Sequence, residues 1–295
     1  MRCARWVFAS SILTALGACS LTTSLGGLSG GDVIAANGPS DGDAPDAMMN
    51  DGRTETGTST EAGAEGGANA YRAVVLADAP LAYYRLDDQG MTAKDEVGAH
   101  DGVYKGTVTH GAGAIAGDTN RAATFDGMTG YVDIGDVLAF TNDAPFTIEA
   151  WASPVNGATD PACIASKSFA SGGVGGNISE GYTVYLRQDG NTVTVARYRS
   201  GVDDTISGPS VTSGTFTHVV ATYDGATIAI WIDGVSVASG ASTRALVSTT
   251  QPLTIGASRG GIYCYFRGAL DEVAIYGKAL AGGTIRAHHA AGLGN

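Results

Sequence analysis

The chain has 295 residues, which allows one large domain or two ordinary ones, and 44 of them are glycine. This glycine content, together with few charged residues, indicates many tight turns rather than long helices. The formal charge is −12, and the sequence has no basic stripe that could neutralise phosphates. Nucleic acids and anionic membrane surfaces are therefore poor candidates as partners.

The N-terminus has the order of features of a bacterial lipoprotein signal peptide. Two arginines precede an apolar run at residues 6–15 that is too short to remain in a membrane as a helix. The run ends in Leu16-Gly-Ala-Cys19, which resembles the lipobox, where small residues allow cleavage and the cysteine is acylated. Residues 1–18 are thus predicted to be removed and Cys19 to be lipidated, with Ser20 favouring the outer membrane of the bacterial cell envelope. An ordinary cleaved signal peptide with a chance cysteine is the alternative.

A long segment of low complexity follows. Residues 19–70 contain no aromatic side chain and little besides Gly, Ala, Ser, Thr, Asp and Glu. Such a segment cannot bury enough apolar surface to offset the entropy of ordering it. We expect a disordered tether between the membrane and a folded domain.

From Tyr71 onward the pattern is typical of β-structure. Short runs of Val, Ile, Thr and aromatic residues, many alternating with period two, recur between Gly, Asp and Asn clusters, and Asp224-Gly225 and Asp233-Gly234 indicate hairpin turns. One short helix is expected over residues 281–291. The pattern predicts an all-β sandwich or barrel over residues 71–292. Strands are expected at 82–86, 122–125, 131–134, 146–151, 182–186, 192–198, 217–223, 227–232, 235–238, 253–255 and 270–276.

Several strings in this region resemble the laminin G-like, concanavalin A-like jelly-roll family, in its bacterial branch. They include Phe146-Thr-Ile-Glu-Ala-Trp151, Thr217-His-Val-Val-Ala-Thr-Tyr-Asp-Gly225 and Gly268-Ala-Leu-Asp-Glu-Val-Ala-Ile-Tyr276. The resemblance covers essentially all of residues 71–292. It implies two antiparallel sheets of six or seven strands and a non-catalytic role in binding glycans or protein surfaces, in some members with calcium.

No catalytic residues are expected. Related glucanases carry Glu-x-Asp-x-x-Glu on one strand, but Glu149 is followed at those positions by Trp151 and Pro154. His288 and His289 are adjacent on the expected helix and so diverge by about 100°, which is poor geometry for holding one metal. We interpret them as a solvated pair, and His218 as a packing or hydrogen-bonding residue.

The folded region contains two further candidate sites. Cys163 and Cys264 are its two cysteines, and in an exported chain such a pair favours a disulfide over two buried thiols. Calcium is the one cofactor that the resemblance implies, with Asp95 and Asp271 as its ligands.

Asp271 and Glu272 look like an acid/base pair, but alternation along a strand separates them. Consecutive side chains of a strand point to opposite faces. We therefore expect Asp271 to be buried with amide, cation or basic partners, and Glu272 to lie on the surface.

Aromatic side chains supply the candidate ligand site. Trp231, Tyr182 and Tyr185 are the rings we assign to contact with a ligand. Three hypotheses follow: a surface-anchored lipoprotein whose domain binds glycans, an adhesion or assembly module that recognises a protein, and a glycoside-acting enzyme without a recognisable motif.

Overall fold

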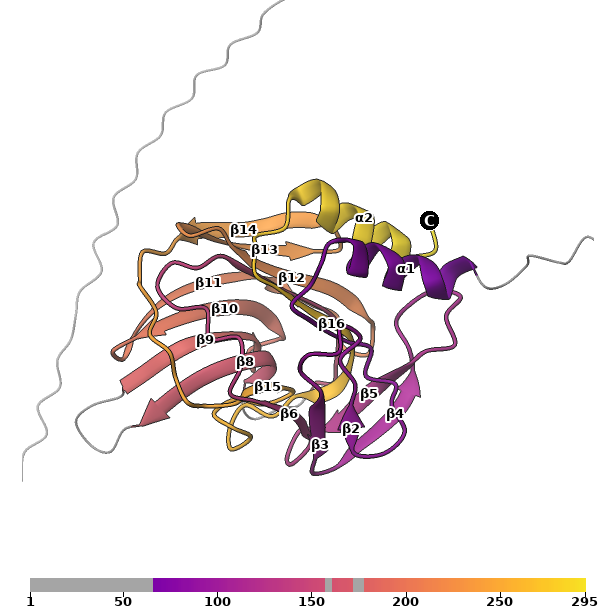
Figure 1. The fold of residues 1–295 in the computed structure, drawn as a ribbon, viewed down its shortest axis with the longest axis horizontal. Helices are drawn as coiled ribbons and strands as arrows, with labels where there is room; N and C mark the ends of the chain where they lie inside the picture. The colour runs from indigo at the N-terminus through magenta and orange to yellow at the C-terminus, as the bar shows by residue number, and fades with distance from the viewer. Residues whose placement is uncertain (1–65, 157–160, 172–177) are drawn as a thin grey trace, which may run out of the picture. The chain divides into compact units, whose positions relative to one another are not determined.

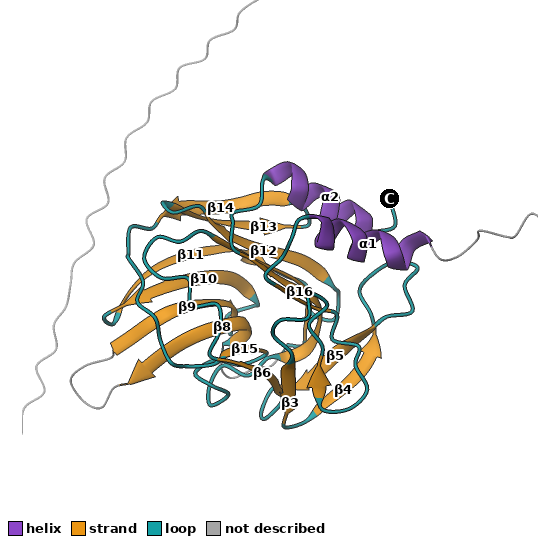
Figure 2. Cartoon of the chain, viewed as in Figure 1, coloured by secondary structure: helices purple, strands orange, loops and turns teal. Residues whose placement is uncertain are grey.

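The computed structural model of the chain describes residues 66–156, 161–171 and 178–295. The predictions for the signal peptide, for Cys19 and for the tether up to residue 65 lie outside these residues. Within them, two antiparallel β-sheets pack face to face, and two helices cover the outer face of one sheet (Figure 1, Figure 2). The predicted all-β sandwich is confirmed.

The first sheet, here called sheet A, is the one that the helices cover. Its strands are β1 (Ala82–Tyr84), β4 (Val108–Ala112), β5 (Arg121–Asp126), β7 (Phe146–Pro154), β12 (Thr217–Tyr223), β13 (Thr227–Ile232), β14 (Val235–Ala241) and β16 (Arg267–Tyr276). They run in the order β14-β13-β12-β7-β16-β5-β4, and β1 pairs with β16. The strands β5 and β1 pair with successive halves of β16 along the same side, so β16 is central to the sheet.

The second sheet, sheet B, faces sheet A across the core. Its strands are β2 (Thr92–Ala93), β3 (Gly102–Lys105), β6 (Tyr131–Gly135), β8 (Ala162–Ser171), β9 (Ile178–Arg187), β10 (Thr192–Arg199), β11 (Val202–Ser210) and β15 (Leu253–Ile255). They run in the order β11-β10-β9-β8-β15-β6-β3-β2. Each sheet thus has eight strands within the described residues, one or two more than the resemblance implied.

Alternation along the strands builds the core between the sheets. In β9, Tyr182, Val184 and Leu186 point inward, and they meet Phe146 and Ile148 of β7 from the facing sheet. The rings of Phe146 and Tyr182 stack at 5.2 Å. Each fully buried side chain of this size contributes about 1.5–3 kcal/mol, so the alternation fixes the register of both sheets.

A second apolar cluster lies on the outer face of sheet A. The helices α1 (Gly66–Ala77) and α2 (Gly282–Gly292) lie side by side there (Figure 2) and pack on β7, β12 and β16 through Tyr71, Val75, Trp151, Val220, Ala274, Tyr276 and Ile285. The prediction of a C-terminal helix is confirmed, but α1 was not predicted and begins inside the segment assigned to the tether. No helix in the described residues is long and apolar enough to cross a membrane.

Five strands were missed because their sequences lack a clear apolar alternation. Strand β8 reads Ala-Cys-Ile-Ala-Ser-Lys-Ser-Phe-Ala-Ser, and β11 contains Asp203-Asp204 and Gly208-Pro209. Strand β11 lies at the edge of sheet B, where a proline that donates no hydrogen bond is tolerated. The other three, β2, β3 and β4, are short and lie at or near the opposite edges of the sheets.

Candidate functional site

The Asp271-Glu272 pair lies at a β-bulge in β16. Asp271 pairs with Trp151 of β7, but Ala274 pairs with Glu149, so β16 holds one extra residue between these positions. Glu272 has a left-handed φ of 51°. The bulge turns both carboxylates to one side of the strand, where Nδ2 of Asn120 donates to each of them. The predicted separation onto opposite faces is wrong.

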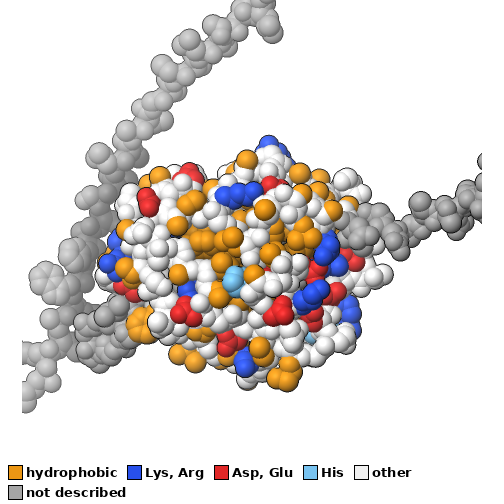
Figure 3. All heavy atoms as spheres, in the orientation of Figure 1, with side chains coloured by type: hydrophobic (Ala, Val, Ile, Leu, Met, Phe, Trp, Pro, Cys, Tyr) orange, Lys and Arg blue, Asp and Glu red, His pale blue; other side chains and the backbone are white. Residues whose placement is uncertain are grey.

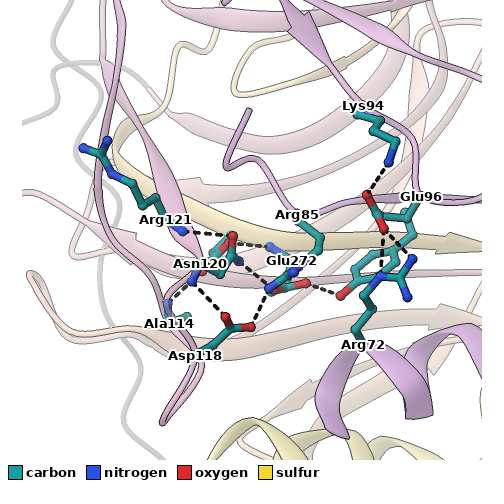
Figure 4. Close-up of polar contacts among 11 residues, drawn as sticks. Arg72, Arg85, Lys94, Glu96, Ala114, Asp118, Asn120, Arg121 and Glu272 are labelled. Carbon is teal, nitrogen blue, oxygen red and sulfur yellow. Dashed lines mark hydrogen bonds and ion pairs between the residues drawn. The ribbon is translucent and has the colours of Figure 1, made fainter. Parts of the chain in front are cut away.

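Both carboxylates are buried in a dense polar network, and Figure 4 shows the part of it around Glu272, Asn120 and Arg85. The backbone N–H of Ala114 donates to Asp271 at 2.7 Å, while Tyr83 and Arg85 donate to Glu272, and Arg85 also pairs with Asp118. Burial raises the pKa of both carboxyls, and the charge of Asp271 raises that of Glu272 further, although Arg85 opposes both shifts. The prediction that Asp271 is buried with partners is confirmed, and the prediction of an exposed Glu272 is wrong.

Asp95 organises a loop through backbone amides. Its Oδ1 accepts from the N–H groups of Tyr83 and Val97, and its Oδ2 accepts from those of Ala99 and His100, at 2.9–3.1 Å. In the described residues, no group of three or more His, Cys, Asp or Glu side chains has a geometry that could hold a metal. The carboxylates of Asp95 and Asp271 both accept hydrogen bonds from N–H groups, and calcium binding by either of them stays a prediction.

A third polar network fastens the helices to sheet A. Glu149 of β7 is buried and accepts from His218 at 2.8 Å, from Tyr71 and Tyr276 at 3.0 Å, and from His288 at 3.0 Å. Burial would raise the pKa of Glu149, but its hydrogen bonds to the two histidines hold that pKa well below the ordinary value. Glu149 is fully buried, and its partners lie on α1, α2, β12 and β16, so the network joins both helices to sheet A.

This network corrects one histidine assignment and agrees with another. His288 is buried, and its second ring nitrogen lies 3.1 Å from Asp78, just beyond α1. It is not solvated, as was expected. His289 is half-buried and stacks on Trp151 with the ring centroids 5.8 Å apart. His218 makes the hydrogen bond that the sequence suggested.

A pocket of about 220 Å³ lies on the outer face of sheet B. Alternation places it there: in β9, Thr183 and Tyr185 point away from the core that Tyr182, Val184 and Leu186 enter. Neighbouring strands add Ser168 and Tyr198. Tyrosine rings and hydroxyl groups thus make up much of the described lining, and Arg259 is its one residue with a formal charge. Its described residues are Pro161, Cys163, Ser168, Phe169, Ser179, Thr183, Tyr185, Tyr198, Ser258, Arg259, Tyr263 and Cys264.

A disulfide forms part of the pocket wall. Cys163 of β8 is bonded to Cys264, with the Cα atoms 5.3 Å apart, as the sequence predicted. It ties the turn that carries Arg259 and Tyr263 to the sheet. The hydroxyls of Ser168 and Thr183 each hydrogen-bond Ser166. Those of Tyr185 and Tyr198 make no hydrogen bond with any described side chain, so they are available to a ligand.

Of the three aromatic residues assigned to a ligand, the structure places one in the pocket. Tyr185 lines it. Tyr182 is 1% exposed, and its hydroxyl donates to the carbonyl of Leu138, so it is a core residue. Trp231 lies beneath α2, so close that a Cβ on Gly282 would come within 2.6 Å of its ring. The assignment of Tyr182 is corrected, while Trp231 is half-buried and lies outside this pocket, so its assignment stays a prediction.

Sequence reasoning missed Arg259 and the hydroxyl residues of β8 and β9 as pocket residues. The sequence did indicate which residues of β9 face the pocket. Tyr182 and Tyr185 are an odd number of residues apart, and such a spacing places two side chains on opposite faces of a strand. No comparable signal marked Arg259. On the face of the molecule in Figure 3, acidic and basic side chains are interspersed, so that face offers no broad basic area to a nucleic acid.

Comparison with known families supports the fold. A family model for laminin G-like domains, described as the concanavalin A-like lectin/glucanases superfamily, matches residues 126–286. The match spans most of both sheets and every described pocket residue. Comparison with curated protein sequences gave no match.

Solved structures show the same architecture at low sequence identity. Domain 4 of AbnA, a GH43 extracellular arabinanase from Geobacillus stearothermophilus in complex with arabinotriose, is 19% identical, with a TM-score of 0.54 over 71% of this chain and 98% of that one. The binding domain of Paraclostridial Mosquitocidal Protein 1 is 16% identical, with a TM-score of 0.53 over 70% and 51%. A Trypanosoma rangeli sialidase mutant displaying trans-sialidase activity is 15% identical, with a TM-score of 0.50 over 72% and 33%. The chain thus spans about half of the second structure and a third of the last, and these likenesses concern the fold.

Proposed function

The chain belongs to the concanavalin A-like lectin/glucanases superfamily, and on this premise we propose that it is a carbohydrate-binding protein of the bacterial cell envelope that holds a glycan in the pocket of sheet B without cleaving it. The observation that carries the proposal is the lining of this pocket. Tyr185, Tyr198 and Tyr263 supply aromatic rings, and Ser168, Ser179 and Thr183 supply hydroxyls. A sugar has both apolar C–H faces and hydroxyl groups, so rings beside hydrogen-bonding groups suit it.

The size and the fold agree with this ligand class. A volume of about 220 Å³ is below the roughly 300–1,000 Å³ typical of pockets for drug-sized ligands, which suits a short part of a glycan. The arabinanase domain, nearly all of which aligns with this chain, is in complex with arabinotriose. A domain of this fold can therefore hold an oligosaccharide.

Binding without turnover is favoured by the absence of acids from the described lining. Glycosidases of the common type need two carboxyl groups about 5–10 Å apart across the scissile bond. None of the described pocket residues is Asp or Glu. The adjacent carboxylates Asp271 and Glu272 are buried on sheet A and engaged by Asn120.

A glycan array probed with the full chain, followed by calorimetry on the glycans that bind, tests the proposal. Tyr263→Ala removes an exposed ring and should weaken binding by up to about tenfold. Ile262→Ala is the matched control, because Ile262 is 75% exposed and does not line the pocket. Mass spectrometry should recover the bound glycan unchanged. Binding that is insensitive to Tyr263→Ala, or released cleavage products, would contradict the proposal.

The envelope location rests on the sequence of residues 1–19. Lipidation of Cys19 predicts that the protein fractionates with membranes and incorporates labelled fatty acid in bacterial cells. Cys19→Ser should abolish both and release the protein into the soluble fraction. A Cys19→Ser variant that still incorporates the label would refute this assignment.

A further inference from the structure

The pocket of sheet B holds one formal charge within its described lining. Of its twelve described residues, Arg259 alone is ionised at neutral pH. This contrasts with the chain as a whole, whose formal charge is −12. The pocket therefore presents a positive group to its ligand within an acidic protein.

The backbone holds Arg259 at the pocket. Arg259, Gly260 and Gly261 have φ values of 53°, 67° and 81°, and a bridge between Ser258 and Tyr263 closes the turn that they form. The N–H of Ser258 donates to the carbonyl of Tyr263 at 2.8 Å. The disulfide of Cys264, next along the chain, fixes this turn to β8. Arg259 is thus carried by a constrained turn and not by a free loop.

The side chain of Arg259 is also positioned. Its guanidinium carbon lies 4.8 Å from the ring centroid of Tyr263, the distance of a cation–π contact. Stacking on the ring leaves the N–H groups at the edge of the guanidinium plane free to donate. Since Arg259 is half-buried, its unused donors are partly withdrawn from water, and an anionic acceptor would restore their hydrogen bonds.

Within the described part of the chain, Arg259 forms no ion pair. Asp203 of β11 is the carboxylate whose negative charge raises the pKa of both Tyr185 and Tyr198. It accepts a hydrogen bond from Thr205. Asp203 is exposed and does not line the pocket. The charge of Arg259 is therefore not cancelled by a carboxylate inside the described lining.

We infer that the ligand of this pocket is an acidic glycan, whose carboxylate or sulfate group accepts paired hydrogen bonds from Arg259 while its hydroxyls bond to Tyr185 and Tyr198. A planar guanidinium suits both anions because it offers two parallel N–H donors. The inference rests on the proposed glycan-binding function and adds the charge of the ligand to it.

Matched glycan pairs test this inference in the full chain. The array should carry oligosaccharides with uronate, sialate or sulfate groups, each beside the neutral oligosaccharide that lacks the acidic group. We expect at least one acidic glycan to bind about tenfold or more tightly than its neutral partner, and added salt to reduce this preference. The three acidic sets distinguish a carboxylate from a sulfate.

Substitutions then attribute the preference to Arg259. Arg259→Gln should abolish the acidic preference, whereas Arg259→Lys should retain part of it. Arg286→Gln makes the same charge change at an exposed position on α2 and should change nothing. Equal binding of acidic and neutral partners, or a preference that survives Arg259→Gln, would overturn the inference while leaving glycan binding intact. Absence of binding to any glycan would refute the proposed function itself.

Discussion

Asp271 and Glu272 are consecutive residues of β16, yet one amide nitrogen, Nδ2 of Asn120, donates to both, at 3.2 Å and 2.7 Å. The bulge that brings them together falls between the halves of β16 that pair with β5 and with β1. Asp118 and Glu272 both pair with the single guanidinium of Arg85, while Asp271 shares the amide of Asn120 with Glu272. Burial is the largest cause of the raised pKa of both carboxyls, and the charge of Asp271 raises the pKa of Glu272 further.

The first prediction concerns pH and Glu272. A carboxyl with a raised pKa holds its proton in the folded chain at pH values where the unfolded chain has lost it. Its contribution to stability is therefore greatest at low pH and declines as pH rises from about 4 through the folded pKa. In Glu272→Gln the amide imitates the protonated acid, so the decline in the free energy of unfolding between pH 5 and 9 should be smaller by about 1–3 kcal/mol.

Denaturation by urea at several pH values measures this difference. Asp189→Asn, at an exposed hairpin position between β9 and β10, is the control and should leave the pH dependence of the wild type unchanged. A Glu272→Gln variant with the same pH dependence as the wild type would show that folding does not raise the pKa of Glu272.

The second prediction concerns Asp95 and calcium. In Asp95→Ala four backbone N–H groups lose their acceptor, and each unsatisfied donor costs about 1–3 kcal/mol when buried. We expect the free energy of unfolding to fall by about 3 kcal/mol or more. Because amides already occupy both oxygens, calcium and a chelator should give the same thermal midpoint for the wild-type protein. A midpoint that calcium raises in the wild type but not in Asp95→Ala would contradict this expectation and identify Asp95 as a calcium ligand.

The β-sandwich could be predicted from the sequence because strands and tight turns leave local patterns of apolar alternation and turn residues. Strands β12 and β13 were predicted residue for residue, since alternating apolar residues flank Asp224-Gly225, a pair that favours a tight turn. The Asp271-Glu272 bulge could not be predicted in this way. Alternation assumes an unbroken ladder, and a single extra residue, accommodated by the left-handed φ of Glu272, reverses the expected faces.

The pocket was predictable only in part, for a related reason. Tyr185 lies on a regular strand, where its face follows from its position. Arg259 lies in a turn with three consecutive left-handed residues, and no periodicity relates such a turn to the strands it will meet. The meeting of this turn with β8 depends on the long-range bond between Cys163 and Cys264. The pair Cys163 and Cys264 was therefore the one sequence feature that predicted contact between β8 and this turn.

The third prediction concerns the attachment of α2 to sheet A. Burial lowers the pKa of His288, but its hydrogen bonds to Glu149 and Asp78 outweigh that effect and raise it above the ordinary value. The stabilisation is therefore fully present below the unfolded pKa of about 6.5 and is lost as pH rises through the folded pKa. His288→Gln should lower the free energy of unfolding by about 3–5 kcal/mol at pH 6 and by less at pH 9.

Arg286→Gln, on the exposed side of the same helix, separates this effect from a general loss of helix charge. It should alter stability by less than about 0.5 kcal/mol at both pH values. If His288→Gln destabilised the protein equally at pH 6 and pH 9, the imidazole would be neutral in the folded state, and the ionic description of the network would be wrong.

The fourth prediction concerns the disulfide, which links stability to the pocket. The bond closes a loop between residues 101 positions apart, so the double variant Cys163→Ala/Cys264→Ala should lose about 2–5 kcal/mol of unfolding free energy. The hydrogen bond from the N–H of Cys163 to the carbonyl of Cys264 remains and should keep the turn near β8. Without the covalent tie, Arg259 and Tyr263 are held less firmly, so glycan affinity should fall as well.

Equilibrium denaturation and calorimetry measure the two effects separately, with reduced wild-type protein as the control. Reduced wild type and the double variant should behave alike, and a variant with lowered stability but unchanged affinity would show that the turn is rigid without its disulfide.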